Sequence, residues 1–94
     1  MMKQPTDLPS TAFMLAMRYQ SQHIPLADVI KQYMPHLTYD YAHRRATEQS
    51  LPFPVFRSDP NSKKSAYLVR VSDLALWLDS VAEQAARDWK NVNE

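Results

Sequence analysis

The side chains best suited to recognising another molecule gather in a short polar stretch near the middle of the chain. Residues 38–49 combine a threonine with aromatic, imidazole and guanidinium groups, and the candidates for contact are Thr38, Tyr39, Tyr41, His43, Arg44 and Arg45. Arginine can pair with guanine edges or hold phosphate, and tyrosine can touch phosphate or thymine methyl groups. We therefore expect a helix that reads the major groove of DNA. The alternative is an ordinary solvated helix face.

Positive charge continues beyond this stretch. Residues 44–71 contain six basic and two acidic side chains, a net charge of +4, whereas residues 72–94 sum to −3. The basic residues that follow the polar stretch are Arg57, Lys63, Lys64 and Arg70. A basic centre beside an acidic end is typical of a surface that binds a polyanion. The alternative is that these cations only solvate the surface.

Proline and capping residues divide the chain, which has no glycine, into four expected helices. Hydroxyl side chains can accept hydrogen bonds from the exposed amides of a first helical turn, and proline is tolerated in that turn. The helices are expected at about 11–20 after Ser10 or Thr11, from Pro25 to just before Pro35, at 39–49 after Thr38, and from a cap at Ser72 to about Lys90.

Apolar residues at spacings of three and four predict which helix faces are buried. The first helix offers Phe13, Ala16 and Met17 on a face widened by Ala12 and Leu15, with Met14 and Met17 as core filler. The second offers Leu26, Val29, Ile30 and Tyr33. The third has only small residues, Ala42 and Ala46, flanked by Leu37 and Leu51. The last has Leu74, Trp77, Leu78, Val81 and Ala85.

Two short strands are expected between the third and fourth helices. Residues 53–57 can form only an edge strand because Pro52 and Pro54 cannot donate to a sheet ladder. Residues 58–62 predict a turn, 21–24 a polar link, and 66–71 alternate with Tyr67, Val69 and Val71 on one side. The order helix, helix, turn, helix, hairpin, helix predicts a mainly α, α+β winged helix-turn-helix domain. The recognition helix would be 39–49, the wing 57–70, the domain 10–90, the N-terminal arm 1–9 and the C-terminal tail 91–94.

Composition argues against several other classes. The chain has 94 residues and no cysteine, so we expect one domain without disulfides or thiolate metal sites. His36, Asp40 and His43 lie close in sequence, but no fourth ligand is near, so we expect no metal and no cofactor. There is no glycine-rich phosphate loop and no cysteine nucleophile, so we expect no enzyme. No run approaches the roughly 18 apolar residues of a membrane span; the expected location is cytoplasmic, at the nucleoid.

An ordered set of short stretches resembles the pyocin activator protein PrtN family. The matching residues are Thr11-Ala12-Phe13 with Leu15 and Ala16, Ile24-Pro25-Leu26, Tyr33, His36-Leu37-Thr38, Leu51, Pro54, Lys63-Lys64, Val71-Ser72-Asp73-Leu74-Ala75 and Leu78-Asp79. The resemblance implies transcriptional activation of bacteriocin or phage-like genes through upstream DNA, and a winged-helix architecture like that of excisionases and MerR-type regulators. Two features depart from it. Gln49-Ser50 stands where relatives often have glycine. The face formed by Tyr39, Tyr41 and His43 is particular to this chain, so the DNA sequence that relatives bind is not expected to be its target.

Other roles and partners stay open at this stage. An excisionase-like factor that bends DNA would share the fold, and a protein–protein interaction module could use the tyrosine-rich helix to grip a regulatory partner. Double-stranded DNA is the expected partner, and RNA polymerase is a further candidate. The alanine-rich outer stripe of the last helix offers a homodimer seam, and Trp89 would lie either there or in terminal helix packing.

Overall fold

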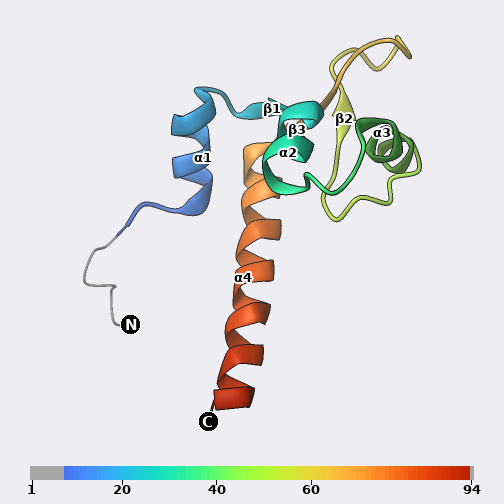
Figure 1. Ribbon diagram of the computed structural model, residues 1–94. Coiled ribbons are helices and arrows are strands. Elements are labelled where there is room, and N and C mark those ends of the chain that lie inside the picture. Colours follow the sequence, from blue (N-terminus) through green and yellow to red (C-terminus); the bar gives the residue numbers. More distant parts are fainter. Residues whose placement is uncertain (1–7, 94) are drawn as a thin grey trace.

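The computed structural model describes residues 8–93, which form four helices and a three-stranded antiparallel sheet (Figure 1). The elements are α1 (Thr11–Tyr19), β1 (His23–Pro25), α2 (Leu26–Tyr33), α3 (Tyr39–Thr47), β2 (Phe56–Arg57), β3 (Tyr67–Arg70) and α4 (Val71–Asn93). The mainly helical α+β class and the four helices are confirmed. Most of the expected arm and the last residue of the expected tail lie outside the described residues. Within the described range, no helix is long and apolar enough to cross a membrane.

Two of the predicted helix caps are confirmed and one is wrong. Ser10 Oγ accepts from the Phe13 amide and Thr38 Oγ1 from the Tyr41 amide, both at 3.1 Å. Ser72 is not a cap, because α4 already begins at Val71, where β3 runs directly into the helix. The Val71 amide donates to the Gln22 carbonyl at 2.9 Å, so the neighbouring strand segment satisfies part of this helix start.

Two glutamines end helices in the way glycine commonly does. Gln20 after α1 has φ 53° and Gln49 after α3 has φ 57°. At the end of α3, the Ser50 amide donates to the Arg45 carbonyl and the Gln49 amide to the Ala46 carbonyl. This pair of bonds is the Schellman closure, which needs a left-handed residue just past the helix. The chain therefore makes these turns without glycine, at some cost in backbone energy.

The sheet contains a strand that was not predicted. The strand order is β1-β3-β2, with His23 opposite Arg70 and Ile24 opposite Val69. The expectation of a polar link at 21–24 is therefore wrong over its last two residues, because Ile24 is fully buried against β3. β2 is an edge strand, as predicted, but it begins only at Phe56.

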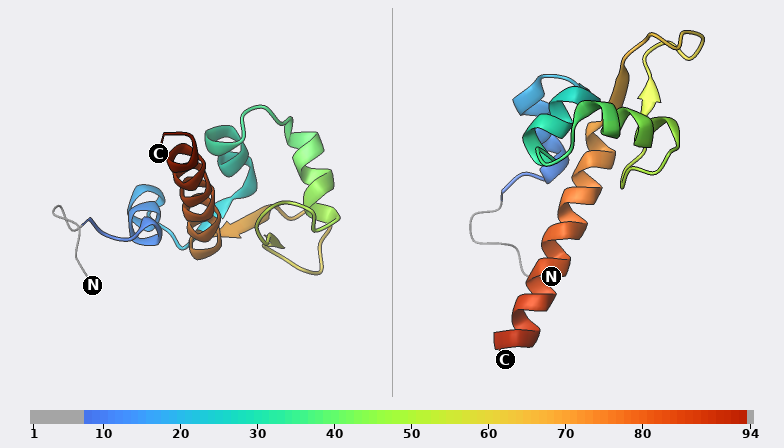
Figure 2. Two further views of the ribbon diagram at one scale, coloured as in Figure 1. Left: turned by 90° about the horizontal axis from the view of Figure 1, so that it is seen from below. Right: turned by 45° about the vertical axis from the view of Figure 1, so that its right-hand side comes forward.

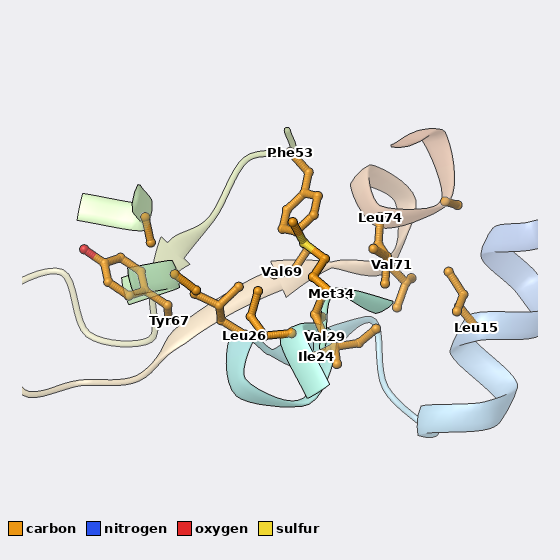
Figure 3. Close-up of a cluster of buried hydrophobic side chains, with 14 residues drawn as sticks. Leu15, Ile24, Leu26, Val29, Met34, Phe53, Tyr67, Val69, Val71 and Leu74 are labelled. Atoms are coloured by element: carbon orange, nitrogen blue, oxygen red, sulfur yellow. The ribbon is translucent and has the colours of Figure 1, made fainter. Parts of the chain in front are cut away.

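The core lies where α2, α3, the sheet and the start of α4 meet (Figure 3). The predicted faces of α2 and α3 are confirmed. Phe53 enters the core rather than a strand, and its ring meets Trp77 edge-on at 5.3 Å between centroids. The buried side chains are Leu15, Ile24, Leu26, Val29, Ile30, Met34, Ala42, Ala46, Phe53, Tyr67, Val69, Val71, Leu74 and Ala75.

The expected inner face of α1 is wrong in part. Phe13, Met14 and Met17 are 54%, 53% and 62% exposed, whereas Leu15 is buried and Ala12 and Ala16 pack against the core, as predicted. Both faces are apolar, so helical spacing alone could not choose between them. α1 packs chiefly on α4 and turns its other face away from the domain (Figure 1).

The last helix projects out of the domain, so that the molecule is 50 Å long (Figure 1). α1 runs antiparallel beside the first half of α4, and Thr11 Oγ1 donates to Asp79 Oδ1 at 2.6 Å. Beyond that contact every described residue of α4, from Ser80 to Asn93, is exposed. The predicted inner stripe therefore holds for Leu74, Trp77 and Leu78 but not for Val81 and Ala85.

Candidate nucleic-acid interface

The two helices expected to form the helix-turn-helix pack against each other with a five-residue connection, residues 34–38. Ala42 and Ala46 form the buried side of α3 and are almost fully covered. Because alanine side chains are small, the α3 backbone lies close to the core. The rest of its circumference is left for polar side chains.

Arg44 lies at the centre of the exposed face of α3. Asp40, Arg44 and Glu48 follow one another at four-residue spacing and are all exposed. The Arg44 guanidinium lies 5.3 Å from the centre of the Tyr41 ring, which stays partly exposed. This strip combines one cation with two carboxylates, so it can donate to guanine and accept from cytosine. The two carboxylates were not among the predicted site residues.

The Arg45 guanidinium forms hydrogen bonds within the protein. Its Nε donates to Ser50 Oγ at 2.7 Å, its second terminal nitrogen donates to the Ser50 carbonyl, and Nη1 donates to the Tyr41 hydroxyl at 3.0 Å. The guanidinium also lies 5.6 Å from the centre of the Tyr41 ring. Arg45 therefore ties the end of α3 to the turn that follows it, although by sequence it is indistinguishable from Arg44.

His43 and Thr47 join α3 to the sheet. The half-buried His43 ring lies between Tyr39, at 5.9 Å, and Tyr67 on β3, at 5.1 Å. Thr47 Oγ1 is 3.1 Å from the Tyr67 hydroxyl. These contacts fix the angle of α3 against β3. Tyr67 was predicted only to lie on one side of a strand with Val69 and Val71, and no pattern in the sequence indicates its contacts with α3.

The β2–β3 connection is a nine-residue loop, residues 58–66, rather than a tight turn. Arg57 supports it from beneath: the guanidinium lies 4.4 Å from the Tyr67 ring centre, and Nη1 donates to the carbonyls of Lys63, at 2.8 Å, and Ser65, at 3.3 Å. The side chains of Lys63 and Lys64 are exposed on the loop. The loop and α3 lie at the same end of the molecule, away from α1 and the end of α4 (Figure 2).

Arg70 does not join this group. Alternation along β3 buries Tyr67 and Val69 and exposes Arg70, which therefore lies on the outer face of the sheet, opposite His23 on β1. The structure thus places Thr38, Tyr39, Tyr41 and Arg44 on exposed parts of α3, at the end of the molecule that also carries the loop with Lys63 and Lys64, and it engages Arg45, His43 and Arg57 in contacts within the protein. Among the described residues, no group of three or more metal-ligating side chains comes together.

Comparison with known proteins gives one match. The family described as Pyocin activator protein PrtN matches residues 11–85, which include α1 to α3, the sheet and α4 as far as Ala85. No curated protein sequence and no solved structure matches the chain. The chain therefore belongs to the pyocin activator protein PrtN family, a family of transcriptional activators and not of enzymes.

Proposed function

We propose that the protein activates phage-like or bacteriocin genes by binding upstream double-stranded DNA as a winged helix-turn-helix domain. α3 would enter the major groove of the DNA, and the β2–β3 loop would be the wing that contacts the DNA sugar–phosphate backbone. The observation that carries the proposal is that α3 buries only alanines and presents Arg44 outward, beside a braced loop with two exposed lysines.

The side chains of this surface have different proposed contacts with DNA. Arg44 reads a base edge, since a guanidinium pairs well with the two acceptors of guanine. Thr38, Tyr39 and Tyr41 contact phosphate or thymine methyl groups near the start of α3. Lys63 and Lys64 contact the adjacent backbone, which adds affinity and little sequence information. Arg45, His43 and Arg57 act by holding α3 and the loop, and Arg70 adds positive potential from the outer face of the sheet.

The salt dependence of DNA affinity follows from the number of side chains that contact phosphate. Because Arg45 and Arg57 are engaged with protein carbonyls and tyrosine rings, and Arg44 reads a base edge, the exposed cations of this surface that remain for phosphate in each copy are Lys63 and Lys64. Each phosphate contact contributes about −0.9 to the slope of log K against log salt, so we expect a slope near −2 per copy, and near −3 if Arg44 holds phosphate instead.

The test is selection from random and genomic duplexes at two salt concentrations, followed by affinity measurements on the selected sequences. Recovery of a shared motif with a salt slope of about −2 to −3 per copy supports the proposal. No binding at low salt by folded protein would overturn it and favour the protein–protein interaction module. A strong bend in the selected DNA, with no effect on transcription, would favour the excisionase-like role.

Two partners complete the proposal. RNA polymerase would be contacted from a surface away from α3, because α3 faces the DNA in this proposal. A second copy would bind through α4, because a single nine-residue helix reads a short half-site and natural operators commonly pair two.

A further inference from the structure

The side of α3 that faces directly away from the core carries three charged side chains. Ala42 and Ala46 mark the buried side of this helix. Each residue advances an α-helix by about 100°, so Arg44 lies opposite the midpoint of the two alanines, and Asp40 and Glu48 lie about 40° to either side of it. All three charged side chains are exposed. In a groove entered with this side forward, the outer strip formed by these three residues would be closest to the base edges.

The two carboxylates of the outer strip have no partner within the described part of the protein. Opposite charges four residues apart on a helix often pair, but here the Arg44 guanidinium lies over the Tyr41 ring, 5.3 Å from its centre. Within residues 8–93, neither the Asp40 nor the Glu48 carboxylate forms a hydrogen bond or an ion pair. Their oxygen atoms are therefore available as acceptors on the side of α3 that would face DNA.

Helix stability accounts for only one of these carboxylates. Asp40 lies in the first turn of α3, where the partial positive charge of a helix start favours an acidic side chain. Glu48 is the C-terminal cap residue, where the partial negative charge of the helix end disfavours one. A carboxylate that faces a polyanion also weakens association through repulsion. The position of Glu48 therefore costs both stability and affinity, which indicates a role in the choice of partner.

The hydrogen-bonding groups of the major groove identify a partner for these oxygens. An ionised carboxylate only accepts hydrogen bonds, so it requires a donor. The donors that base pairs present in the major groove are the amino groups of cytosine and adenine, and cytosine is the usual partner of aspartate and glutamate. Adenine carries an acceptor nitrogen beside its amino group, and guanine and thymine present carbonyl oxygens, all of which repel a carboxylate.

We propose that Asp40 and Glu48 determine which DNA sequence the protein selects, each by accepting a hydrogen bond from a cytosine amino group, on either side of a guanine contacted by Arg44. The inference deepens the proposed function and rests on it for the entry of α3 into the major groove. It assigns the choice of bases to two acidic residues, whereas the basic residues of the loop supply affinity.

The spacing of the outer strip sets the length of the half-site. Four residues of an α-helix rise about 6 Å, and stacked base pairs are about 3.4 Å apart. Neighbouring residues of the strip therefore lie about two base pairs apart along a groove. We expect a half-site that contains three G·C pairs within about five base pairs, the central one read by Arg44.

Selection from a randomised half-site tests the assignment with variants that keep the shape of each side chain and remove its charge. Asparagine and glutamine pair with adenine, through its amino group and the neighbouring ring nitrogen. Asp40→Asn and Glu48→Gln should therefore each change the preference at one position from cytosine to adenine, with discrimination of about 5- to 150-fold, and leave the central guanine unchanged. Each variant should also bind random duplex DNA at least about twofold more tightly, because one repulsive charge is lost.

Glu83→Gln is the matched control, since it removes the same charge from an exposed site on α4, away from α3; it should leave every base preference unchanged. Thermal unfolding confirms that the variants are folded, and Glu48→Gln should not lower Tm, because it removes the unfavourable charge at the end of α3. A variant of Asp40 or Glu48 with the base preferences of wild type would overturn the assignment of that residue and leave the proposed function standing. Wild-type protein that binds no DNA would overturn both.

Discussion

Adjacent arginines on α3 should behave differently when each is replaced by alanine. Arg44 is exposed, and its guanidinium lies over the Tyr41 ring. We expect Arg44→Ala to leave the free energy of unfolding within about 0.5 kcal/mol of wild type, as is usual for surface substitutions. If Arg44 binds guanine, its loss costs about 1–3 kcal/mol of binding, roughly 5- to 150-fold in affinity, mostly on the selected sequence. If it holds phosphate, the salt slope falls by about 0.9.

Arg45→Ala should instead destabilise the fold. The substitution removes three hydrogen bonds that join α3 to Ser50 and Tyr41. Hydrogen bonds from charged groups contribute about 1.5–3 kcal/mol in buried settings, and partial exposure of this site reduces that, so we expect a loss of about 1–2 kcal/mol. In a domain of this size that lowers Tm by about 4–8 °C for each kcal/mol.

Fluorescence anisotropy across a salt series, together with thermal unfolding, measures both effects. Arg87→Ala is the matched control, since it removes an exposed cation from α4, far from α3; it should change neither the salt slope nor Tm appreciably. A stable Arg45→Ala variant with lost DNA binding, beside an Arg44→Ala variant that binds normally, would reverse the two assignments. An Arg44→Ala/Arg45→Ala double variant would mix the two effects, so the single variants are the informative ones.

Three further predictions concern the supports of the same surface. Replacing both Lys63 and Lys64 by alanine should lower the salt slope by about 2, with unchanged sequence preference and unfolding; an unchanged slope would remove the loop from the interface. Tyr67→Phe should cost about 0.5–1.5 kcal/mol in urea unfolding, because the Thr47 hydroxyl contact is lost; equal stability would mean that this contact does not hold α3. Gln49→Gly should raise stability by about 0.5–1 kcal/mol, because glycine avoids the left-handed cost at φ 57°, and a lower Tm would contradict that reading.

Local signals in the sequence were sufficient for much of the fold. Ser10 and Thr38 marked helix starts because a hydroxyl one residue before a helix satisfies a first-turn amide wherever it occurs. The α2 stripe and the paired alanines of α3 located buried faces because helical spacing repeats every few residues. The family, too, was recognisable from short stretches of residues.

Features that depend on distant segments were decided only by the tertiary structure. Ile24 lies in a strand because it pairs with Val69, which is far along the chain. Phe13 and Met17 are exposed because α4 covers the other face of α1. Arg44 and Arg45 have different roles because neighbouring residues point to different sides of a helix. Only Arg45 points toward the turn at Ser50, with which it forms hydrogen bonds. Residue types and spacing thus determined which segments are helical and which side chains are candidates for contact with DNA, whereas contacts between remote segments decided which of those side chains remain exposed.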